Sequence, residues 1–151
     1  MRGKKTDFSD SQCSIARAIG LVGEPWSLLI VRDALRGTRR FSEFQRSLGM
    51  AKNILSDRLR KLVAAGVLDM HPSAEGSTRN EYLVTDKGRQ LAIVLAALAT
   101  WGGNHAFAAD EAAPVLVDRR DGLPVRIVAL AEDGRELEPA DTKLTTPGAP
   151  A

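Results

Sequence analysis

The chain has 151 residues, of which 44% are hydrophobic and 26% are charged, enough for one domain with a buried core. No apolar run approaches the roughly 20 residues of a membrane-spanning helix, and no apolar stretch follows the basic N-terminus, so we expect a cytoplasmic protein without membrane contact. The single cysteine, Cys13, excludes an internal disulfide framework and a multi-cysteine metal site, and we expect no metal and no cofactor.

The net charge of +2 conceals an uneven distribution along the chain. Residues 1–109 carry 16 Lys and Arg against 10 Asp and Glu, whereas residues 110–151 carry 5 against 9. The basic excess is densest between Arg32 and Lys61, where 9 basic residues stand against 3 acidic ones. Such an excess is typical of a surface that binds a polyanion, although a well-solvated helix surface would also produce it.

The N-terminal part of the chain predicts a polar tail and two helices. Residues 1–10 are polar, and a helix is expected from about Ser11 to Val22 because apolar residues recur there at helical spacing. A second helix follows Gly23, with Pro25 in its first turn, and ends at Gly37. Its apolar residues cover so wide a face that the helix is predicted to be largely buried: Trp26, Leu28, Leu29, Ile30, Val31 and Leu35.

Residues 41–66 predict a helix-turn-helix. A helix of about two turns has one apolar face, Gly49 follows it, and a longer helix runs from Ala51 to Ala65 before Gly66. The apolar face of the first helix holds Phe41, Phe44 and Leu48, and that of the second holds Leu55, Leu59 and Leu62. The opposite face of the second helix is polar and consists of Lys52, Asn53, Ser56 and Arg60.

After Gly66 the apolar spacing changes from helical to alternating. The stretches "VLDMH" and "TRNEYLVT" predict a β-hairpin with "PSAEGS" as its loop. A long helix is expected to about residue 107, with Thr85 or Asp86 as its cap, and it is apolar over so much of its circumference that it indicates a partner outside its own chain. Two Asp-Gly turns, at 121–122 and 133–134, predict a short β-meander.

The predicted fold is mainly α with a small β-hairpin wing, a winged helix-turn-helix, followed by a short C-terminal β-meander. We expect a flexible tail over residues 1–10 and a domain for DNA binding and dimerisation over residues 11–109. An acidic β extension over residues 110–142 and a disordered tail over residues 143–151 complete the chain.

A series of motifs across residues 11–105 resembles the HxlR-type transcriptional regulators, which are relatives of MarR-like winged-helix repressors. The motifs are Cys13, Gly23-x-x-Trp26, Arg36-Gly37, Arg40-Phe41-x-Glu43-Phe44, Leu55-Ser56-x-Arg58-Leu59-x-x-Leu62, Gly66-Val67-Leu68 and Tyr82-x-x-Thr85-x-x-Gly88. The resemblance implies a dimeric DNA-binding regulator whose first and last helices form the dimer. The interface residues that it implies here are Ile15, Ile19, Leu95, Leu98 and Trp101.

The chain departs from common members of that family in two places. Ala51 stands where many have a Ser cap, so the following helix is expected to be less well capped, by about 1 kcal/mol. The acidic segment from about Pro114 looks like an addition. In some relatives a cysteine-rich piece occupies that place, but no cysteine stands there in this chain, and no zinc is implied.

Three groups of residues are candidates for DNA contact, and a solvated surface is the alternative for each. Major-groove candidates are Lys52, Asn53, Ser56 and Arg60, because Asn can pair with adenine and Arg or Lys with guanine. Phosphate candidates at a helix start are Arg39, Arg40 and Ser42. Wing candidates for the minor groove or the backbone are Ser77, Thr78 and Arg79.

Three further charged residues have different expected roles. Lys87, at the start of the last helix, is a phosphate candidate. Arg58 is either a phosphate contact or a member of a structural ion pair. Asp57 would repel phosphate, so it either accepts a hydrogen bond from a cytosine amino group or, as we favour, bridges to Lys61 one turn further on.

Cys13 lies near a helix N-terminus, where the helix dipole and unpaired N–H groups stabilise a thiolate. The HxlR-type regulators that this chain resembles sometimes sense oxidants or electrophiles through a cysteine at this site. The alternative is a small buried apolar residue. Because the chain has no second cysteine, a switch would need a disulfide across the dimer or a small-thiol cap.

The sequence therefore predicts a homodimeric DNA-binding regulator, a repressor rather than an activator, on a pseudo-palindromic operator of double-stranded DNA. A small-molecule effector is left open. The alternative is a winged-helix protein-interaction module whose basic face binds no specific DNA. An enzyme is not expected, because we find no nucleophile–base pair, no phosphate-cradling glycine loop and no carboxylate cluster.

Overall fold

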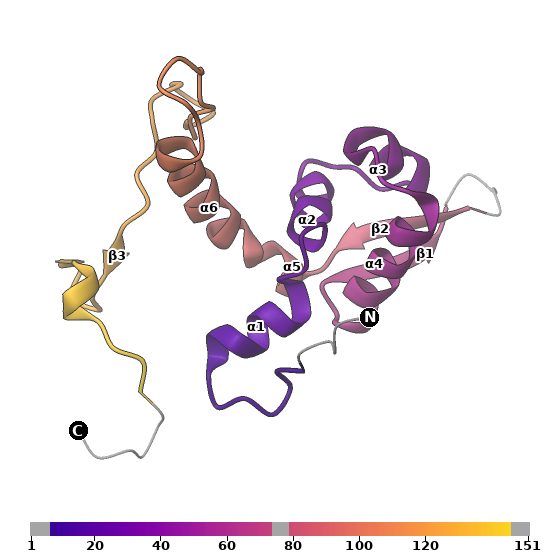
Figure 1. The fold of residues 1–151 in the computed structure, drawn as a ribbon, viewed down its shortest axis with the longest axis horizontal. Helices are drawn as coiled ribbons and strands as arrows, with labels where there is room; N and C mark the ends of the chain where they lie inside the picture. The colour runs from indigo at the N-terminus through magenta and orange to yellow at the C-terminus, as the bar shows by residue number, and fades with distance from the viewer. Residues whose placement is uncertain (1–6, 74–78, 146–151) are drawn as a thin grey trace. The chain divides into compact units, whose positions relative to one another are not determined.

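The computed structural model describes residues 7–73 and 79–145 of the chain (Figure 1). The chain forms two compact units, one up to Leu95 and one from Ala96 onward. The first unit contains the helix-turn-helix and a two-stranded hairpin, so the predicted winged fold is confirmed. Within the described residues no single helix is long and apolar enough to cross a membrane, and α1 with α2 reaches that length and composition only as a pair bent by 77°.

Helix α1 (Ser14–Val22) and helix α2 (Ser27–Leu35) both begin later than predicted. The backbone N–H of Cys13 donates to Ser11 Oγ (3.2 Å), which holds the preceding residues in a turn and makes Cys13 the N-cap. Ser27 N–H donates to the carbonyl of Glu24 (2.9 Å), so Pro25 lies in a turn before α2 rather than in its first turn.

Helix α3 (Phe41–Leu48) and helix α4 (Lys52–Ala64) form the predicted helix-turn-helix. Between them Gly49 adopts φ +64°, a left-handed conformation that costs glycine little and a residue with a Cβ more. The apolar faces of both helices meet α2 in one core. Its fully buried side chains are Ile30, Val31, Phe44, Leu55, Leu59, Leu62, Val67 and Leu68.

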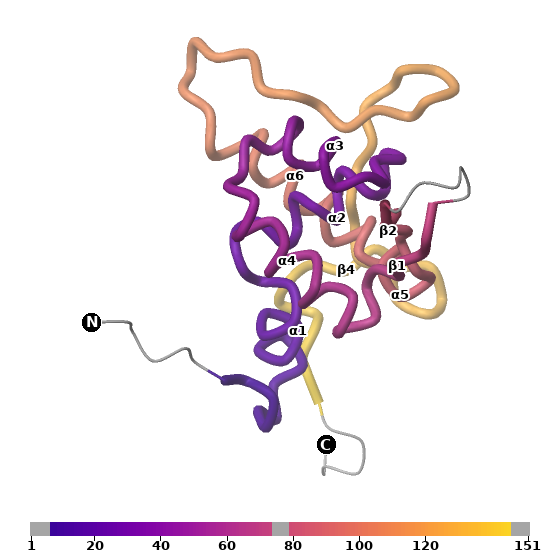
Figure 2. The backbone as a smooth tube through the Cα atoms, turned by 90° about the vertical axis from the view of Figure 1, so that its right-hand side faces the viewer, coloured from indigo at the N-terminus to yellow at the C-terminus, as the bar shows by residue number. Residues whose placement is uncertain are grey.

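The wing consists of β1 (Leu68–Pro72) and β2 (Asn80–Val84), paired antiparallel. In Figure 1 and Figure 2 the two strands lie beside each other, and β1 contacts α4. The ring of Tyr82 packs edge-on against that of Phe44, with centroids 6.4 Å apart. Tyr82 N–H also donates to the carbonyl of Arg39 (2.8 Å), which joins the wing to the residues that lead into α3.

The long helix predicted after the wing is divided at Gln90 into α5 (Asp86–Arg89) and α6 (Leu91–His105). Thr85 is the N-cap of α5, as predicted, and its hydroxyl accepts from Gly88 N–H (3.0 Å). The two parts differ in their packing, because Gly88 of α5 is buried whereas no residue of α6 is.

The second unit has less regular structure than the predicted meander. Both Asp-Gly turns are present, since Gly122 N–H donates to the carbonyl of Asp118 and Gly134 N–H to that of Ala131. The strands beside them are short. An isolated bridge joins Val117 to Pro124, and β3 (Ala129–Leu130) pairs with β4 (Glu136–Leu137) over two residues each before a 3-10 turn (Pro139–Asp141).

Candidate nucleic-acid interface

The outer face of α4 displays the four predicted polar side chains. Leu55, Leu59 and Leu62 are fully buried, and because they recur at helical spacing they turn one side of α4 into the core. The exposed side carries Lys52, Asn53, Ser56 and Arg60. Ala51 is the N-cap of α4 and offers no side-chain hydrogen bond, so the predicted weak capping is confirmed.

Asp57 forms ion pairs with three cations of the same helix. Its carboxylate lies 2.6 Å from Lys61 Nζ, as we had favoured, 2.6 Å from Arg60 Nη2 and 3.0 Å from Arg58 Nη1. The hydrogen bond from Lys61, followed by that from Arg60, holds the pKa of Asp57 below its usual value. Arg60 nonetheless keeps 71% of its side chain exposed, so its guanidinium is oriented by Asp57 and still accessible.

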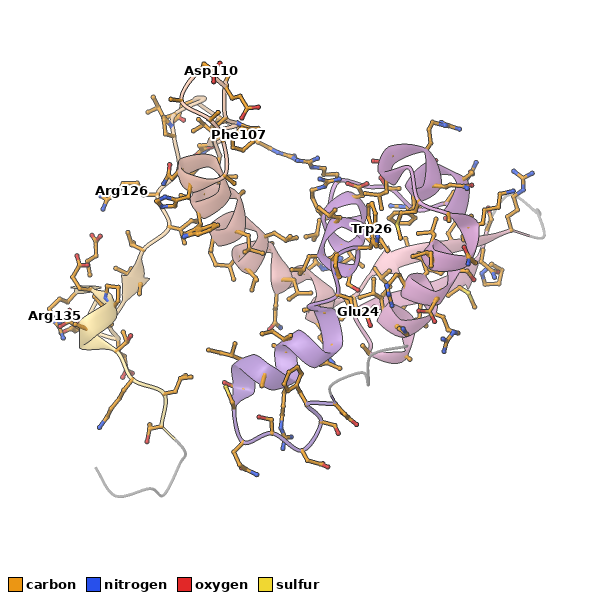
Figure 3. All side chains as sticks on the ribbon, in the orientation of Figure 1. Glu24, Trp26, Phe107, Asp110, Arg126 and Arg135 are labelled. Carbon is orange, nitrogen blue, oxygen red and sulfur yellow. The ribbon has the colours of Figure 1, made fainter. Side chains whose placement is uncertain are left out.

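Arg58 lies between the outer face and the core, and its side chain is 19% exposed. Its guanidinium pairs with Glu24, which lies in the turn between α1 and α2 and is labelled in Figure 3. Glu24 also lies 3.7 Å from Lys61 Nζ. Of the two alternatives for Arg58, the structural ion pair is the one that the structure contains.

The start of α3 brings two arginines to one carboxylate. Glu43 accepts hydrogen bonds from the backbone N–H groups of Arg40 (2.9 Å) and Arg39 (3.1 Å), and these bonds lower the pKa of Glu43. Arg40 Nε lies 3.5 Å from Glu81 of β2. The two carboxylates thus hold the backbone and the guanidinium of Arg40 in place.

A hollow of about 400 Å³ joins the start of α3 to the wing. Arg40, Ser42 and Arg79, which the sequence assigned to two separate groups, all line this hollow. Asn80 and Tyr82 line it as well, and the sequence analysis missed both. The alternation of side chains along β2 places Asn80 and Tyr82 on one face of the strand. That β2 lies beside the start of α3 depends on the pairing of Arg40 with Glu81, which are 41 residues apart, and no local pattern predicts this pairing.

Two other candidates are placed away from this hollow. Arg39 is exposed but lies outside this hollow. Lys87 Nζ donates to the carbonyl of Ala65 (2.7 Å), at the C-terminal end of α4. Ser77 and Thr78 lie outside the described residues, so their predicted wing contacts stay predictions.

The candidates for dimerisation and redox sensing are mostly at the surface. Cys13 is exposed, so the alternative of a buried apolar residue is wrong. Trp101 is 64% and Ile15 57% exposed, and Ile19 and Leu98 are about as exposed. Leu95 is an exception, because it is partly buried against the core of the first unit. Within the described residues no three His, Cys, Asp or Glu side chains converge as a metal site.

Comparison with protein families finds one match, which covers residues 21–110 and describes an HxlR-like helix-turn-helix. The uncharacterised HTH-type transcriptional regulator Rv3095 of Mycobacterium tuberculosis is 40% identical over 114 residues, which are 76% of this chain and 65% of that protein. The HTH-type regulator YvaP of Bacillus subtilis, also uncharacterised, is 36% identical over 86 residues, 56% of this chain and 80% of YvaP. The match therefore spans slightly less than two thirds of the length of Rv3095.

Two solved structures resemble the chain over most of their lengths. PA1607, a candidate transcription factor, is 47% identical, with a TM-score of 0.86 over 93% of this chain and 99% of that one. A second candidate transcription factor, PA1374 of Pseudomonas aeruginosa, is 43% identical, with a TM-score of 0.68 over 91% of this chain and 95% of that one. A match over 93% of 151 residues must include much of the acidic extension, so that segment is shared with PA1607 and is not particular to this chain.

A candidate transcriptional regulator of the MarR family from Enterococcus faecalis is 31% identical, with a TM-score of 0.56 over 68% of this chain and 94% of that one. This match covers about two thirds of the chain. It agrees with the MarR-like resemblance in the sequence.

Replacing Asp57 with Asn tests the ion pairs of α4. Because the pKa of Asp57 in the fold lies below its ordinary value of 3.8, its charge stabilises the fold above that pH, and the contribution is lost as the pH falls through the lowered pKa. Asp57→Asn should therefore cost less than about 1 kcal/mol near pH 7, as for other partly exposed pairs, and progressively less toward pH 2. Urea unfolding over this pH range measures the difference.

Asp69→Asn is the matched control, because Asp69 is exposed and has no ion pair among the described residues. It should leave stability nearly unchanged at every pH. A cost of Asp57→Asn that is the same at pH 7 and pH 2 would contradict the assignment.

Proposed function

Since the chain belongs to the HxlR-like helix-turn-helix family, we propose that it is a sequence-specific transcriptional regulator that binds double-stranded DNA as a homodimer. Its curated relatives are transcriptional regulators, so the chain is not an enzyme. The observation that carries the proposal is the outer face of α4, where four polar side chains are exposed opposite a buried leucine stripe.

In the proposed complex α4 enters the major groove. Asn53 is suited to pair in bidentate fashion with adenine, and Lys52 and Arg60 with guanine. The carboxylate of Asp57 lies 2.6 Å from Arg60 Nη2 and restricts this side chain, so that less side-chain entropy is lost when Arg60 meets a base. This face would select the sequence.

Backbone phosphates are proposed to bind at the hollow between α3 and the wing. The N-terminus of α3 offers N–H groups and a favourable dipole, and Arg40, Ser42 and Arg79 surround the space. Phosphate contacts fix the register of a protein on DNA and supply much of its affinity, whereas they carry no direct sequence information.

Dimerisation is proposed to use the exposed apolar residues of α1 and α6. A 15-residue helix without one buried residue exposes more apolar surface than an isolated soluble chain commonly does. A two-fold dimer would place two copies of α4 in successive major grooves, so that the operator is pseudo-palindromic with half-sites about 10 bp apart. We place the regulator in the cytoplasm and propose repression, by occupation of the operator.

Two substitutions separate base reading from phosphate binding. Asn53→Ala removes a base contact and should relax sequence preference, with a discrimination loss of about 1–3 kcal/mol at one base pair. Arg40→Ala removes a phosphate contact and should weaken binding to all sequences alike, lowering the slope of log affinity against log salt by about 1. Both are measured by gel shift on duplexes that the full chain selects from a randomised library.

Arg135→Ala is a charge-matched control for Arg40→Ala, because Arg135 is exposed in the acidic extension (Figure 3). It should change neither sequence preference nor salt slope. If the wild-type chain selects no sequence, or its binding does not depend on salt, the proposal fails. The chain would then be better explained as a winged-helix protein-interaction module, whose partner binds the exposed apolar α6 and whose basic face binds no specific DNA.

The dimer is tested with Trp101→Glu. A carboxylate at the centre of an apolar interface would be buried without a partner, which costs several kcal/mol, so sedimentation should change from dimer to monomer. Affinity for a duplex with two half-sites should fall with it. Met70→Glu is the control, since Met70 is similarly exposed but lies on the wing, and it should sediment as the wild type does. A dimer that Trp101→Glu leaves intact would contradict the assignment of α6.

We also propose that the regulator responds to oxidants through Cys13. Its support is that the thiol is exposed at the N-cap of α1, on the same helix as the exposed Ile15 and Ile19. Oxidation there would alter the proposed dimer surface. Peroxide should weaken DNA binding of the wild type at least several-fold and leave Cys13→Ser unaffected. Equal responses of the two proteins would exclude Cys13 as the sensor.

A further inference from the structure

Helix α4 is attached to the rest of the first unit at two points, in addition to its buried leucines. The first attachment is the ion pair between Arg58, in the second turn of α4, and Glu24. Lys61 strengthens this attachment, because its Nζ lies 3.7 Å from Glu24 Oε1. Glu24 belongs to the turn that joins α1 to α2, so this attachment connects α4 with the end of α1.

The second attachment is a set of hydrogen bonds at the C-terminal end of α4. Lys87 Nζ donates to the carbonyl of Ala65 (2.7 Å). Thr85 Oγ1 donates to the carbonyl of Gly66 (2.7 Å) and lies 3.1 Å from that of Val67. The last carbonyls of a helix have no partner within it and carry the negative end of the helix dipole, so an ammonium group there is doubly favoured.

Gly88 closes this second attachment. A Cβ at position 88 would lie 2.2 Å from the carbonyl oxygen of Val67, so only glycine allows α5 to approach the end of α4 this closely. Since α5 is followed by α6 after the single residue Gln90, the attachment connects α4 with the beginning of α6.

Two attachments restrict the orientation of α4 more than a single attachment would. Arg58 and Ala65 are seven residues apart, about 10 Å along the helix axis. One attachment fixes a point on a helix, whereas two fix the direction of its axis. The attachments lead to α1 and α6, the two helices that carry the exposed apolar residues of the proposed dimer.

We propose that Glu24 and Lys87 are positioning residues, which hold the axis of α4 at one angle to α1 and to the first turn of α6 and thereby set the half-site spacing that the dimer accepts. The inference rests on the proposed function, because it requires a dimer with one α4 in each half-site. It assigns Lys87 to the end of α4 and not to a phosphate of the DNA.

The physical consequence concerns the second half-site. When one α4 is bound, the other binds its half-site at a high effective concentration only if it is held at the matching distance and angle. An α4 whose tilt is limited only by its buried leucines still fits one major groove, but it loses part of the gain from binding two. Loss of an attachment should therefore affect two-site binding and leave single-site binding nearly unchanged.

The test compares Lys87→Met and Glu24→Gln with the wild-type chain on three kinds of duplex. The probes are the duplex selected from a randomised library, the same duplex with one half-site scrambled, and a series in which the half-site spacing changes by single base pairs. We expect each variant to lose about 10-fold or more on the two-site duplex, to stay within about 2-fold on the single site, and to discriminate less between spacings.

The salt dependence separates positioning from direct contact. If Lys87 bound a phosphate, Lys87→Met would lower the slope on the single-site duplex by about 1, whereas a positioning residue leaves that slope unchanged. Lys87→Arg keeps a cationic donor and should restore most of the two-site affinity. Lys143→Met is the matched control, because Lys143 is exposed in the C-terminal segment, and it should leave all three measurements unchanged.

Several results would overturn the proposal. Equal losses on one-site and two-site duplexes, with a lower salt slope, would make Lys87 a phosphate contact. Unchanged two-site affinity and spacing preference in both variants would show that the attachments do not position α4. If Lys87→Met does not fold by circular dichroism, Glu24→Gln acts on the other attachment and decides the question. A wild-type chain that binds no duplex would instead refute the proposed function, and the inference with it.

Discussion

Burial of the leucine stripe of α4 determines which of its side chains can meet another molecule. Leu55, Leu59 and Leu62 are fully buried against Ile30 and Phe44, and full burial of one such side chain contributes about 1.5–3 kcal/mol. A rotation of α4 by one residue, about 100°, would bring these leucines toward water and carry the polar side chains toward the core. The helix therefore has one stable rotation about its axis. The exposed face opposite the stripe follows from that rotation and needs no ligand to form.

Carboxylates then determine how the surrounding cations are held. Asp57 orients Arg60 while leaving it accessible, Glu24 draws Arg58 toward the turn after α1, and Glu81 holds Arg40 beside the hollow at the wing. The basic excess of the sequence is thus divided among cations with different partners. This division is why the sum of charges alone could indicate a polyanion but could not indicate which residues would touch it.

Local patterns predicted the fold well. The leucine spacing located α4, Gly49 located the turn before it, and Thr85 was recognised as the cap of α5. The departures depend on contacts between distant parts of the chain. Three such contacts matter most: Arg58 with Glu24, Lys87 with the carbonyl of Ala65, and Arg40 with Glu81. Each joins residues that are 22 to 41 positions apart in the sequence. No local pattern encodes them, so Asn80 and Tyr82 were missed and the contact of Lys87 with Ala65 was not predicted. Ser77, Thr78 and the dimer contacts stay predictions.

The central claim is that the outer face of α4 meets DNA. Hydrogen exchange of the full chain, with and without the duplex that it selects from a randomised library, tests this claim most directly. We expect slower exchange at the first turns of α4, at the start of α3 and at β2 beside the hollow, where backbone amides would be covered or stabilised by the bound duplex. Slower exchange confined to α6 and the acidic extension, with α3 and α4 unchanged, would contradict the claim.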